Sequence, residues 1–406
     1  MTNTNDIAIN KYLPLALIYF FVNSFLIPEG LLYTTLLSPL FLYFIIEQKA
    51  LKTFVNLALI ALLFACFHLT LGVQIGSYLK SYVLLLSVFI FCIAFYLFCQ
   101  RVAVLQNVFN SILKVHLVLI PLAFIALQTG LFKTYFWYLV PISPGIPIVP
   151  RLKLFTYEAS YYALLLVPIF FYYLWDYVFS KVKVKAWHLL FVCLLLALSF
   201  SLGVIFGIAL TIGIIVIAHL NRFVSNKRIL TFFIISFLLL LLGLILLYLY
   251  APNNPLFARL KNIPSGKDTS ARGRTYEALQ LGYLIAQQKS IWLGAGLGQI
   301  KEIGRDIIMQ YYQFIHGPSV ARIPNAVGET LAMYGIVGLV IRFGVIVYCF
   351  FKTKVWTNYF RLSLFIFIFI YQFTGSYFFN IVEYVIWILA FSALFPEFNK
   401  SQLRNE

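Results

Sequence analysis

Apolar stretches of a length that suits a membrane recur along the whole chain. Runs of about 17–25 residues with few charges follow one another from Lys11 almost to the C-terminus, and each is long enough to cross the hydrocarbon core of a bilayer. Of the 406 residues, 62% are hydrophobic and only 11% are charged, which is too little polar surface to coat a soluble globule. The pattern predicts a polytopic membrane protein and excludes a disordered chain, a disulfide scaffold and a soluble enzyme.

Helices are the expected spanning element, because lipid offers no partner for free backbone groups. The alternating ten-residue segments of an outer-membrane barrel do not occur in the sequence. We therefore predict a single all-α integral membrane domain of twelve transmembrane helices. The predicted spans are residues 12–28, 31–47, 53–71, 80–99, 109–129, 158–179, 186–200, 203–220, 228–250, 326–351, 360–377 and 381–396.

The stretch 186–220 could form one long helix or two short ones. Basic residues flank both of its ends, so both ends are expected on the cytoplasmic side and the chain should cross twice. Ser199, Ser201 and Gly203 are predicted to form the bend between two short helices.

The formal charge of +17 is first explained by the positive-inside rule and not by a nucleic-acid partner. It places both termini in the cytoplasm. Two outer segments are nevertheless basic. They are the smaller periplasmic loop 130–157 and the large periplasmic loop 251–325, which holds nine Lys and Arg residues against four acidic ones. An ordinary solvated loop and a surface built for an anion both remain open.

The sequence indicates no cofactor or metal. It contains no D-x-D, Walker, H-E-x-x-H or G-x-S-x-G motif, which argues against nucleotide-driven or metal-dependent chemistry. The five cysteines all fall in apolar runs and are interpreted as small buried hydrophobic residues, not as disulfides or metal ligands.

A first group of candidate site residues precedes the span 158–179 at its outer end. Arg151, Lys153, Glu158 and Tyr161 lie within eleven residues of one another. Glu158 could simply stabilise the helix N-terminus and pair with Arg151 or Lys153. Alternatively, Glu158 is a general base or substrate anchor, Arg151 binds a phosphate, and Lys153 and Tyr161 contact substrate.

A second group lies in the large loop. Arg272 and Arg274 precede a predicted helix over Thr275–Gln288, where cations are unfavourable unless an anion is recruited. That helix carries Tyr276, Leu279, Tyr283, Leu284 and Gln287 on one face, which is expected to meet the membrane side of the loop. The sequence Gly294-Ala-Gly-Leu-Gly298 then predicts a tight turn in preference to a phosphate loop, because it follows a helix and not a strand.

A third group surrounds the start of the span 326–351. His316 and Arg322 precede it, and Asn325 and Glu329 share a face one helical turn apart. Arg342 lies deeper in the same span and needs a partner or an aqueous cavity.

Three short elements together resemble a known family. Glu158-Ala-Ser-Tyr-Tyr-Ala looks like the E-P-S-Y-F-A element of Wzy-type polysaccharide polymerases, with Ala159 in place of proline. The stretch from Arg272 to Gly298 looks like the outer loop of the same polymerase and O-antigen ligase superfamily, and Asn325-Ala-Val-Gly-Glu329 looks like its H-N…E element. Pro324 stands where relatives often have histidine, and His316, nine residues before Asn325, is the candidate for that role.

The resemblance implies a membrane glycosyltransferase of the bacterial inner membrane. It would join oligosaccharide units carried on undecaprenyl pyrophosphate at the periplasmic face, without metal or cofactor. Donor and acceptor glycans and the bilayer are then its partners, and a chain-length regulator and a flippase are candidate protein partners. The implied catalytic groups are Glu158, Arg151, Arg272, Arg274, His316 and Glu329, with Lys153, Tyr161, Asn325 and Arg322 binding substrate.

Two other functions remain open. An O-antigen ligase of the same superfamily would transfer finished polymer to lipid A-core. A polysaccharide or lipid transporter would also suit twelve helices, although transporters place polar groups at the membrane midplane and most candidates here lie near one outer edge.

Overall fold

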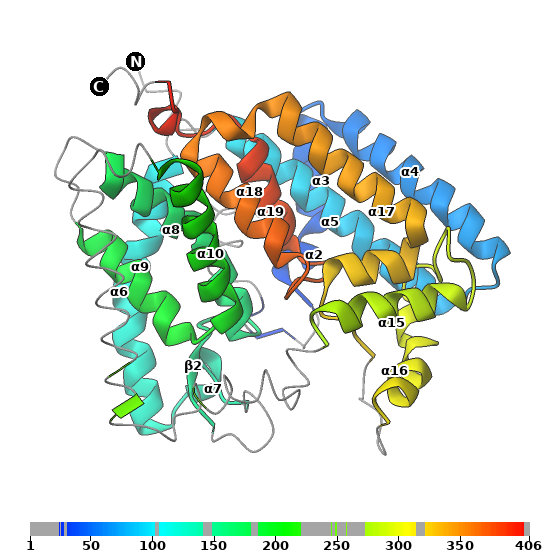
Figure 1. Cartoon of the computed structure of the whole chain (residues 1–406), viewed down its shortest axis with the longest axis horizontal. Helices are drawn as coiled ribbons and strands as arrows, with labels where there is room; N and C mark the ends of the chain where they lie inside the picture. Colours follow the sequence, from blue (N-terminus) through cyan, green and yellow to red (C-terminus); the bar gives the residue numbers. More distant parts are fainter. Residues whose placement is uncertain are drawn as a thin grey trace.

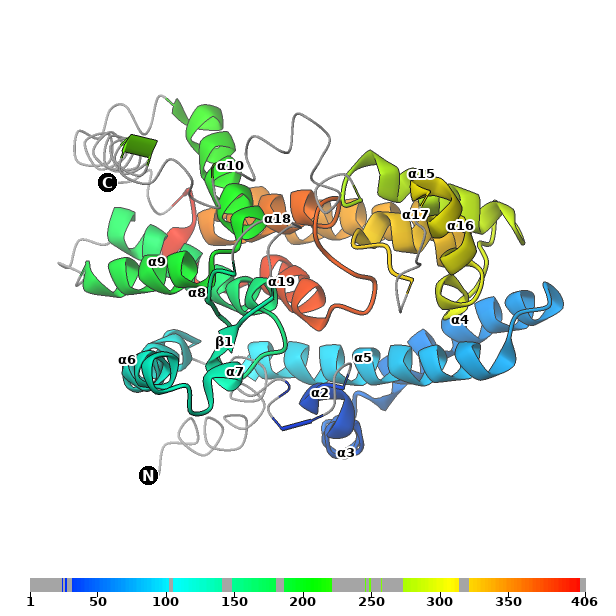
Figure 2. The ribbon, with the colours of Figure 1, turned by 90° about the horizontal axis from the view of Figure 1, so that it is seen from below.

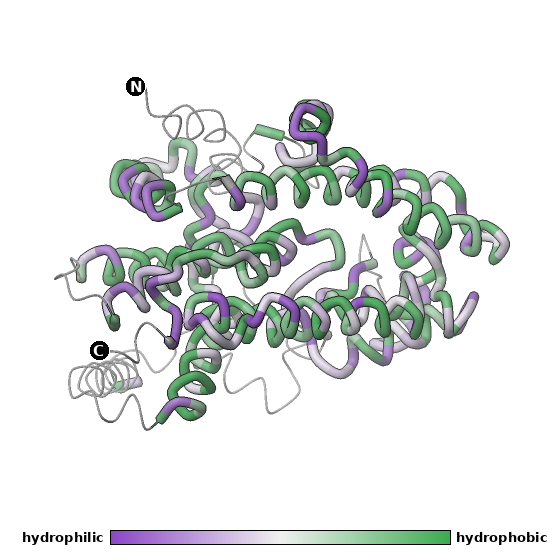
Figure 3. Tube along the Cα trace, turned by 90° about the horizontal axis from the view of Figure 1, so that it is seen from above, coloured by the Kyte–Doolittle hydropathy of each residue, from purple (hydrophilic) through white to green (hydrophobic). Residues whose placement is uncertain are grey.

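The computed structural model describes residues 31–101, 105–140, 148–179, 186–220, 273–313 and 321–401, together with a few isolated positions. Among these residues, five helices are long and apolar enough to cross a membrane, and five shorter apolar helices accompany them. The protein is an all-α membrane protein, as predicted, and its helices stand side by side in Figure 1. The hydropathy colouring of Figure 3 shows that apolar residues dominate most of them.

Ten predicted spans coincide with described helices, while the spans 12–28 and 228–250 lie almost wholly outside the described residues. The span 31–47 is divided into two helices, and the span 360–377 ends early. The bounds are α2 Tyr33–Leu36, α3 Ser38–Glu47, α4 Leu51–Thr70, α5 Ile75–Arg101, α6 Leu105–Thr129, α8 Ala159–Phe179, α9 Trp187–Ser199, α10 Leu202–Ala218, α17 Ala326–Thr353, α18 Tyr359–Tyr371 and α19 Ile381–Phe391.

The stretch 186–220 forms two helices, as predicted. Helix α9 ends at Ser199, and Phe200 then adopts a left-handed backbone with φ of 49°. Helix α10 begins at Leu202, so the bend falls on Phe200 and Ser201 and Gly203 already lies inside the second helix.

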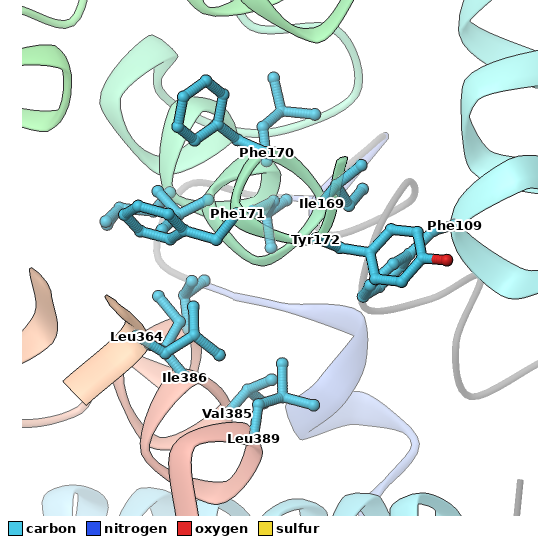
Figure 4. Close-up of a cluster of buried hydrophobic side chains, with 14 of the residues drawn as sticks. Phe109, Ile169, Phe170, Phe171, Tyr172, Leu364, Val385, Ile386 and Leu389 are labelled. Atoms are coloured by element: carbon cyan, nitrogen blue, oxygen red, sulfur yellow. The ribbon is translucent and has the colours of Figure 1, made fainter. Parts of the chain in front are cut away.

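Helix α8 forms the centre of a large hydrophobic core. Its side chains from Ala159 to Trp175 are almost all buried, and they extend on several sides of the helix in Figure 4. Tyr172 packs against Phe109 of α6 with ring centroids 5.6 Å apart. Leu364 of α18 and Leu389 of α19 belong to the same cluster. We call this cluster, which also takes in α3, α9, α10 and part of α5, the large core.

A second, smaller core lies beside it. It combines α4 and the first half of α5 with the helix α15 (Tyr276–Gln287), the 3₁₀ helix η1 (Gln299–Lys301), the helix α16 (Gly304–Tyr312) and the first turns of α17. Figure 2 shows α4, α15, α16 and α17 grouped at one end of the long helix α5 and α6, α8 and α9 at the other. We call this cluster the small core and its boundary with the large core the seam.

Helix α15 confirms the predicted helix but buries a different face. Tyr276 and Tyr283 are exposed, whereas Ala278, Gly282 and Ile285 face the protein. Small residues allow two helices to approach closely, and a Cβ atom on Gly282 would lie 2.5 Å from the Gly328 carbonyl oxygen of α17. Close packing on α17 therefore decides which face of α15 is buried.

The smaller loop contains a two-stranded sheet, which the sequence did not predict. After the short helix α7 (Lys133–Phe136), strand β1 (Trp137–Tyr138) pairs antiparallel with β2 (Arg151–Leu152). We call α7, β1 and β2 the hairpin. The hairpin, α15 and α16 lie at the same end of the molecule, opposite the 3₁₀ helix η3 (Pro396–Phe398), as Figure 1 shows. We call this the loop end.

Candidate functional site

A cavity of about 800 Å³ opens at the seam near the loop end. The residues on its walls come from both cores. On one side, Lys153 stands between Leu152 and Leu154, which are buried in the large core. On the other side, Arg322 is flanked by residues buried in the small core. Five of the predicted site residues line this cavity: Lys153, Glu158, Tyr161, Arg322 and Glu329.

Glu158 directly precedes α8, at the helix N-terminus where the sequence placed it. Its backbone carbonyl accepts a hydrogen bond from Tyr162 N–H at 3.1 Å. Its carboxylate Oε1 accepts a hydrogen bond from Ser160 Oγ at 2.6 Å. The helix dipole favours a negative charge there, so the carboxylate is held at the cavity wall as an acceptor.

Arg151 stands beside the cavity and is fixed by the hairpin. Its guanidinium lies 4.8 Å from the centre of the Tyr138 ring, and Nη2 donates to the Val140 carbonyl oxygen at 3.4 Å. Tyr138 itself lines the cavity. The stacked arrangement holds the cation in one place.

Glu329 lies in the first turn of α17 and accepts a hydrogen bond from the Phe378 N–H. Asn325 is the N-cap of the same helix and is 1% exposed. Its Oδ1 accepts from Gly328 N–H at 2.9 Å, and its Nδ2 donates to the carbonyl oxygens of Arg274 and Phe373. The Asn325 amide is therefore engaged in ordering three chain segments around the site.

Arg274 and the loop between α18 and α19 meet on the same side. Tyr377, from that loop, lines the cavity and lies within electrostatic range of Arg274, Glu158, Arg322 and Glu329. Charged groups from both cores thus surround a single tyrosine. Arg272 and His316 lie outside the described residues.

Three amides of the glycine-rich segment, those of residues 294–296, are bonded within the protein. Helix α17 breaks at Gly335, which has φ of 62°, and four backbone groups beside the break lose their helical partners. Ala295 N–H and Gly296 N–H donate to the Ala332 and Met333 carbonyls. In return, the amides of residues 336 and 337 donate to the carbonyls of residues 291 and 292. The segment 294–298 is a turn, as predicted, and it fills the break in α17.

A comparison with protein families matches part of the chain. Residues 187–343 match the Wzy_C family model, described as O-antigen ligase. The match confirms the resemblance to the O-antigen polymerase and ligase superfamily. No curated protein matches the chain in sequence.

The Wzy_C match covers α9, α10, α15, α16 and the start of α17. It includes Arg274, Arg322, Asn325 and Glu329, whereas Glu158 and the hairpin precede it. The match supports an enzyme of the membrane glycosyltransferase type that acts in O-antigen-related polysaccharide synthesis.

Several cavity residues were missed by the sequence reasoning. Tyr135, Tyr138, Lys301, Tyr377 and Asn380 all line the cavity. Residues 376–380 carry no Lys or Arg, so charge did not single them out. Asn380 followed by Glu383 is an N-cap signature, and Asn380 does accept from Val382 N–H at 3.1 Å. The signature marks the start of α19, which the predicted span 381–396 already gave, and does not indicate the cavity.

The cysteines differ from the prediction in one respect. Cys66 and Cys193 are exposed, whereas Cys99 is buried. Both exposed residues lie on apolar helices, so a lipid-facing position explains why apolar runs need not be buried in protein. Among the described residues, no group of three or more His, Cys, Asp or Glu side chains could hold a metal ion.

Proposed function

We propose that the protein is a polysaccharide polymerase of the inner membrane that joins oligosaccharide units carried on undecaprenyl pyrophosphate at the periplasmic face. The observation that carries the proposal is the cavity at the seam. It combines the carboxylates of Glu158 and Glu329 with the cations Lys153, Lys301 and Arg322.

The proposed reaction needs both kinds of group. A hydroxyl oxygen of the acceptor glycan attacks the anomeric carbon of the donor, and the bond from that carbon to the pyrophosphate oxygen breaks. The hydroxyl proton passes to a carboxylate, for which Glu158 is the first candidate and Glu329 the second. The lipid pyrophosphate departs as an anion.

Cations stabilise that leaving group. Arg322 and Lys153 line the cavity. Arg274, like Glu158, lies within electrostatic range of Tyr377, which lines the same cavity. Preorganised charge of this kind is often the largest contribution to catalysis. Because the pyrophosphate is already a good leaving group, the step as proposed uses neither nucleotide nor metal.

The test is transfer by the purified protein in detergent, with lipid-linked repeat units as the only substrate. We expect lipid-linked products of two or more repeats without added nucleotide or divalent metal. The detergent sample has no second compartment, so elongation there would exclude transport as the activity. A protein that binds the repeats and never elongates them would contradict the proposal.

The O-antigen ligase remains the second candidate, because the matched family model carries that description. A deletion strain separates the two functions. A polymerase deletion leaves glycan of a single repeat, whereas a ligase deletion leaves free lipid-linked polymer and an uncapped lipid A-core.

A further inference from the structure

A buried ion pair connects the second half of α17 to α19, next to the loop whose backbone binds Glu329. Arg342 lies in the second half of α17 and forms an ion pair with Glu383 of α19. The side chains are 10% and 1% exposed, respectively. A buried pair of this kind is costly to desolvate and is weak evidence for a role in stability alone.

The Arg342 guanidinium also reaches across the break at Gly335 to the first half of α17. Its Nη1 donates to Thr330 Oγ1 at 3.4 Å, and Thr330 is the neighbour of Glu329 in the first half of α17. Its Nε donates to Gln372 Oε1 at 3.0 Å. The Gln372 carbonyl in turn accepts from Ala326 N–H at 3.0 Å, at the start of α17.

Gln372 opens the loop that binds Glu329. Within this loop, Phe378 N–H donates to Glu329 Oε2. The Phe378 carbonyl accepts from Tyr384 Oη at 2.7 Å, and Tyr384 directly follows Glu383 in α19. The backbone of Phe378 is thus held through its N–H by Glu329 and through its carbonyl by the helix that carries Glu383.

We infer that Arg342 and Glu383 are positioning residues for the Glu329 carboxylate, an inference that rests on the proposed transferase function. The pair fixes Thr330 on one side of Glu329 and the loop 372–378 on the other. Charge also reaches the carboxylate directly, because Arg322, Arg342 and Glu383 all lie within electrostatic range of Glu329.

The test replaces the pair with apolar side chains of similar size, as Arg342→Met/Glu383→Leu. Such replacements of buried pairs often leave stability unchanged or improved, so Tm serves as the folding control. We expect unchanged Tm, unchanged KM for lipid-linked repeats and a fall in kcat of roughly tenfold or more. The reversed pair Arg342→Glu/Glu383→Arg should recover part of the lost rate.

A second measurement separates positioning from a general structural role. In a Glu329→Gln background, the apolar double substitution should lower kcat by less than about twofold, because effects that act through one group are not additive. Fully additive losses, or wild-type kcat in the apolar variant, would overturn the inference. Absence of any transfer by the wild-type protein would instead overturn the proposed function, so the two failures are distinguishable.

Discussion

Two carboxylates face the cavity, and their surroundings differ residue by residue. Glu158 accepts from the hydroxyl of Ser160, two positions along the same chain segment. Glu329 accepts from the Phe378 backbone, 49 positions away. A side-chain hydroxyl can rotate, whereas a backbone N–H is fixed in place. The Glu158 contact is therefore local, and the Glu329 contact joins two distant segments of the chain.

Removing the proposed base or Arg274 should reduce polymer strongly without loss of protein. We expect Glu158→Gln and Arg274→Ala to be expressed normally and to reduce transfer at least about a hundredfold, because each removes a proton acceptor or a stabilising charge. In-gel glycan profiles and immunoblots measure both quantities.

Arg305→Ala is the matched control for Arg274→Ala, because Arg305 is exposed on α16 and, unlike Arg274, does not belong to the charges described around Tyr377. It should keep wild-type chain length. Wild-type chain length in the Glu158 or Arg274 variant would refute the role assigned to that residue.

The stacking of Arg151 on Tyr138 makes a further prediction. Lysine keeps the charge but loses the planar guanidinium that stacks and donates in two directions. Arg151→Lys should therefore lower transfer by roughly tenfold, measured with purified protein. Normal activity would leave only a general effect of charge.

The residue types of the site were more accessible from the sequence than its geometry. Glu158 and Glu329 could be selected because a carboxylate at the edge of an apolar span needs a reason. Tyr377 and Lys301 could not, because neither has a local signal. Their importance arises only where segments from two cores meet.

At the scale of the helices, the break in α17 depends on glycine. Gly335 has φ of 62°, and a Cβ atom there would lie 2.4 Å from the Trp292 carbonyl oxygen. Gly335→Ala should destabilise the protein by about 2–4 kcal/mol, from backbone strain and overpacking. A fall in Tm of the purified variant measures it.

Gly344→Ala is the control in the same helix, since nothing lies within 4 Å of its Cβ position. Alanine is the better helix former there, so Tm should stay the same or rise. Equal Tm values for both variants would contradict the role of Gly335.

The start of α17 offers another test. Asn325→Ala loses the N-cap and both carbonyl contacts. It should lower the free energy of unfolding by about 1–2 kcal/mol and should also reduce transfer activity. Asn325→Ser retains a capping oxygen without adding a charge and loses the amide contacts to the two carbonyls, so its stability should lie in between. The order of the two Tm values checks the assignment.

For the whole molecule, the arrangement of the two ends predicts a topology. The hairpin, α15 and α16 share the loop end, and η3 lies at the opposite end. In a background without the five native cysteines, Lys133→Cys and Arg305→Cys should react with an impermeant thiol reagent from the periplasm. Lys400→Cys should react only after permeabilisation. Labelling of Arg305→Cys from the cytosol alone would reverse the proposed orientation.

The helices themselves were largely predictable because apolar length alone sets them. The bend at Phe200 followed from the charges that flank residues 186–220. The hairpin could not be predicted, because a two-residue strand such as β2 has no measurable periodicity. The division into two cores also could not be predicted, since membrane helices are apolar on every side and their partners are chosen by shape.

The glycine turn that fills the break in α17 has a consequence for how this helix can bend. Four backbone hydrogen bonds join residues 291–296 to residues 332–337 on both sides of Gly335. Bending of α17 at this point must therefore carry the segment 291–296 with it or break these bonds.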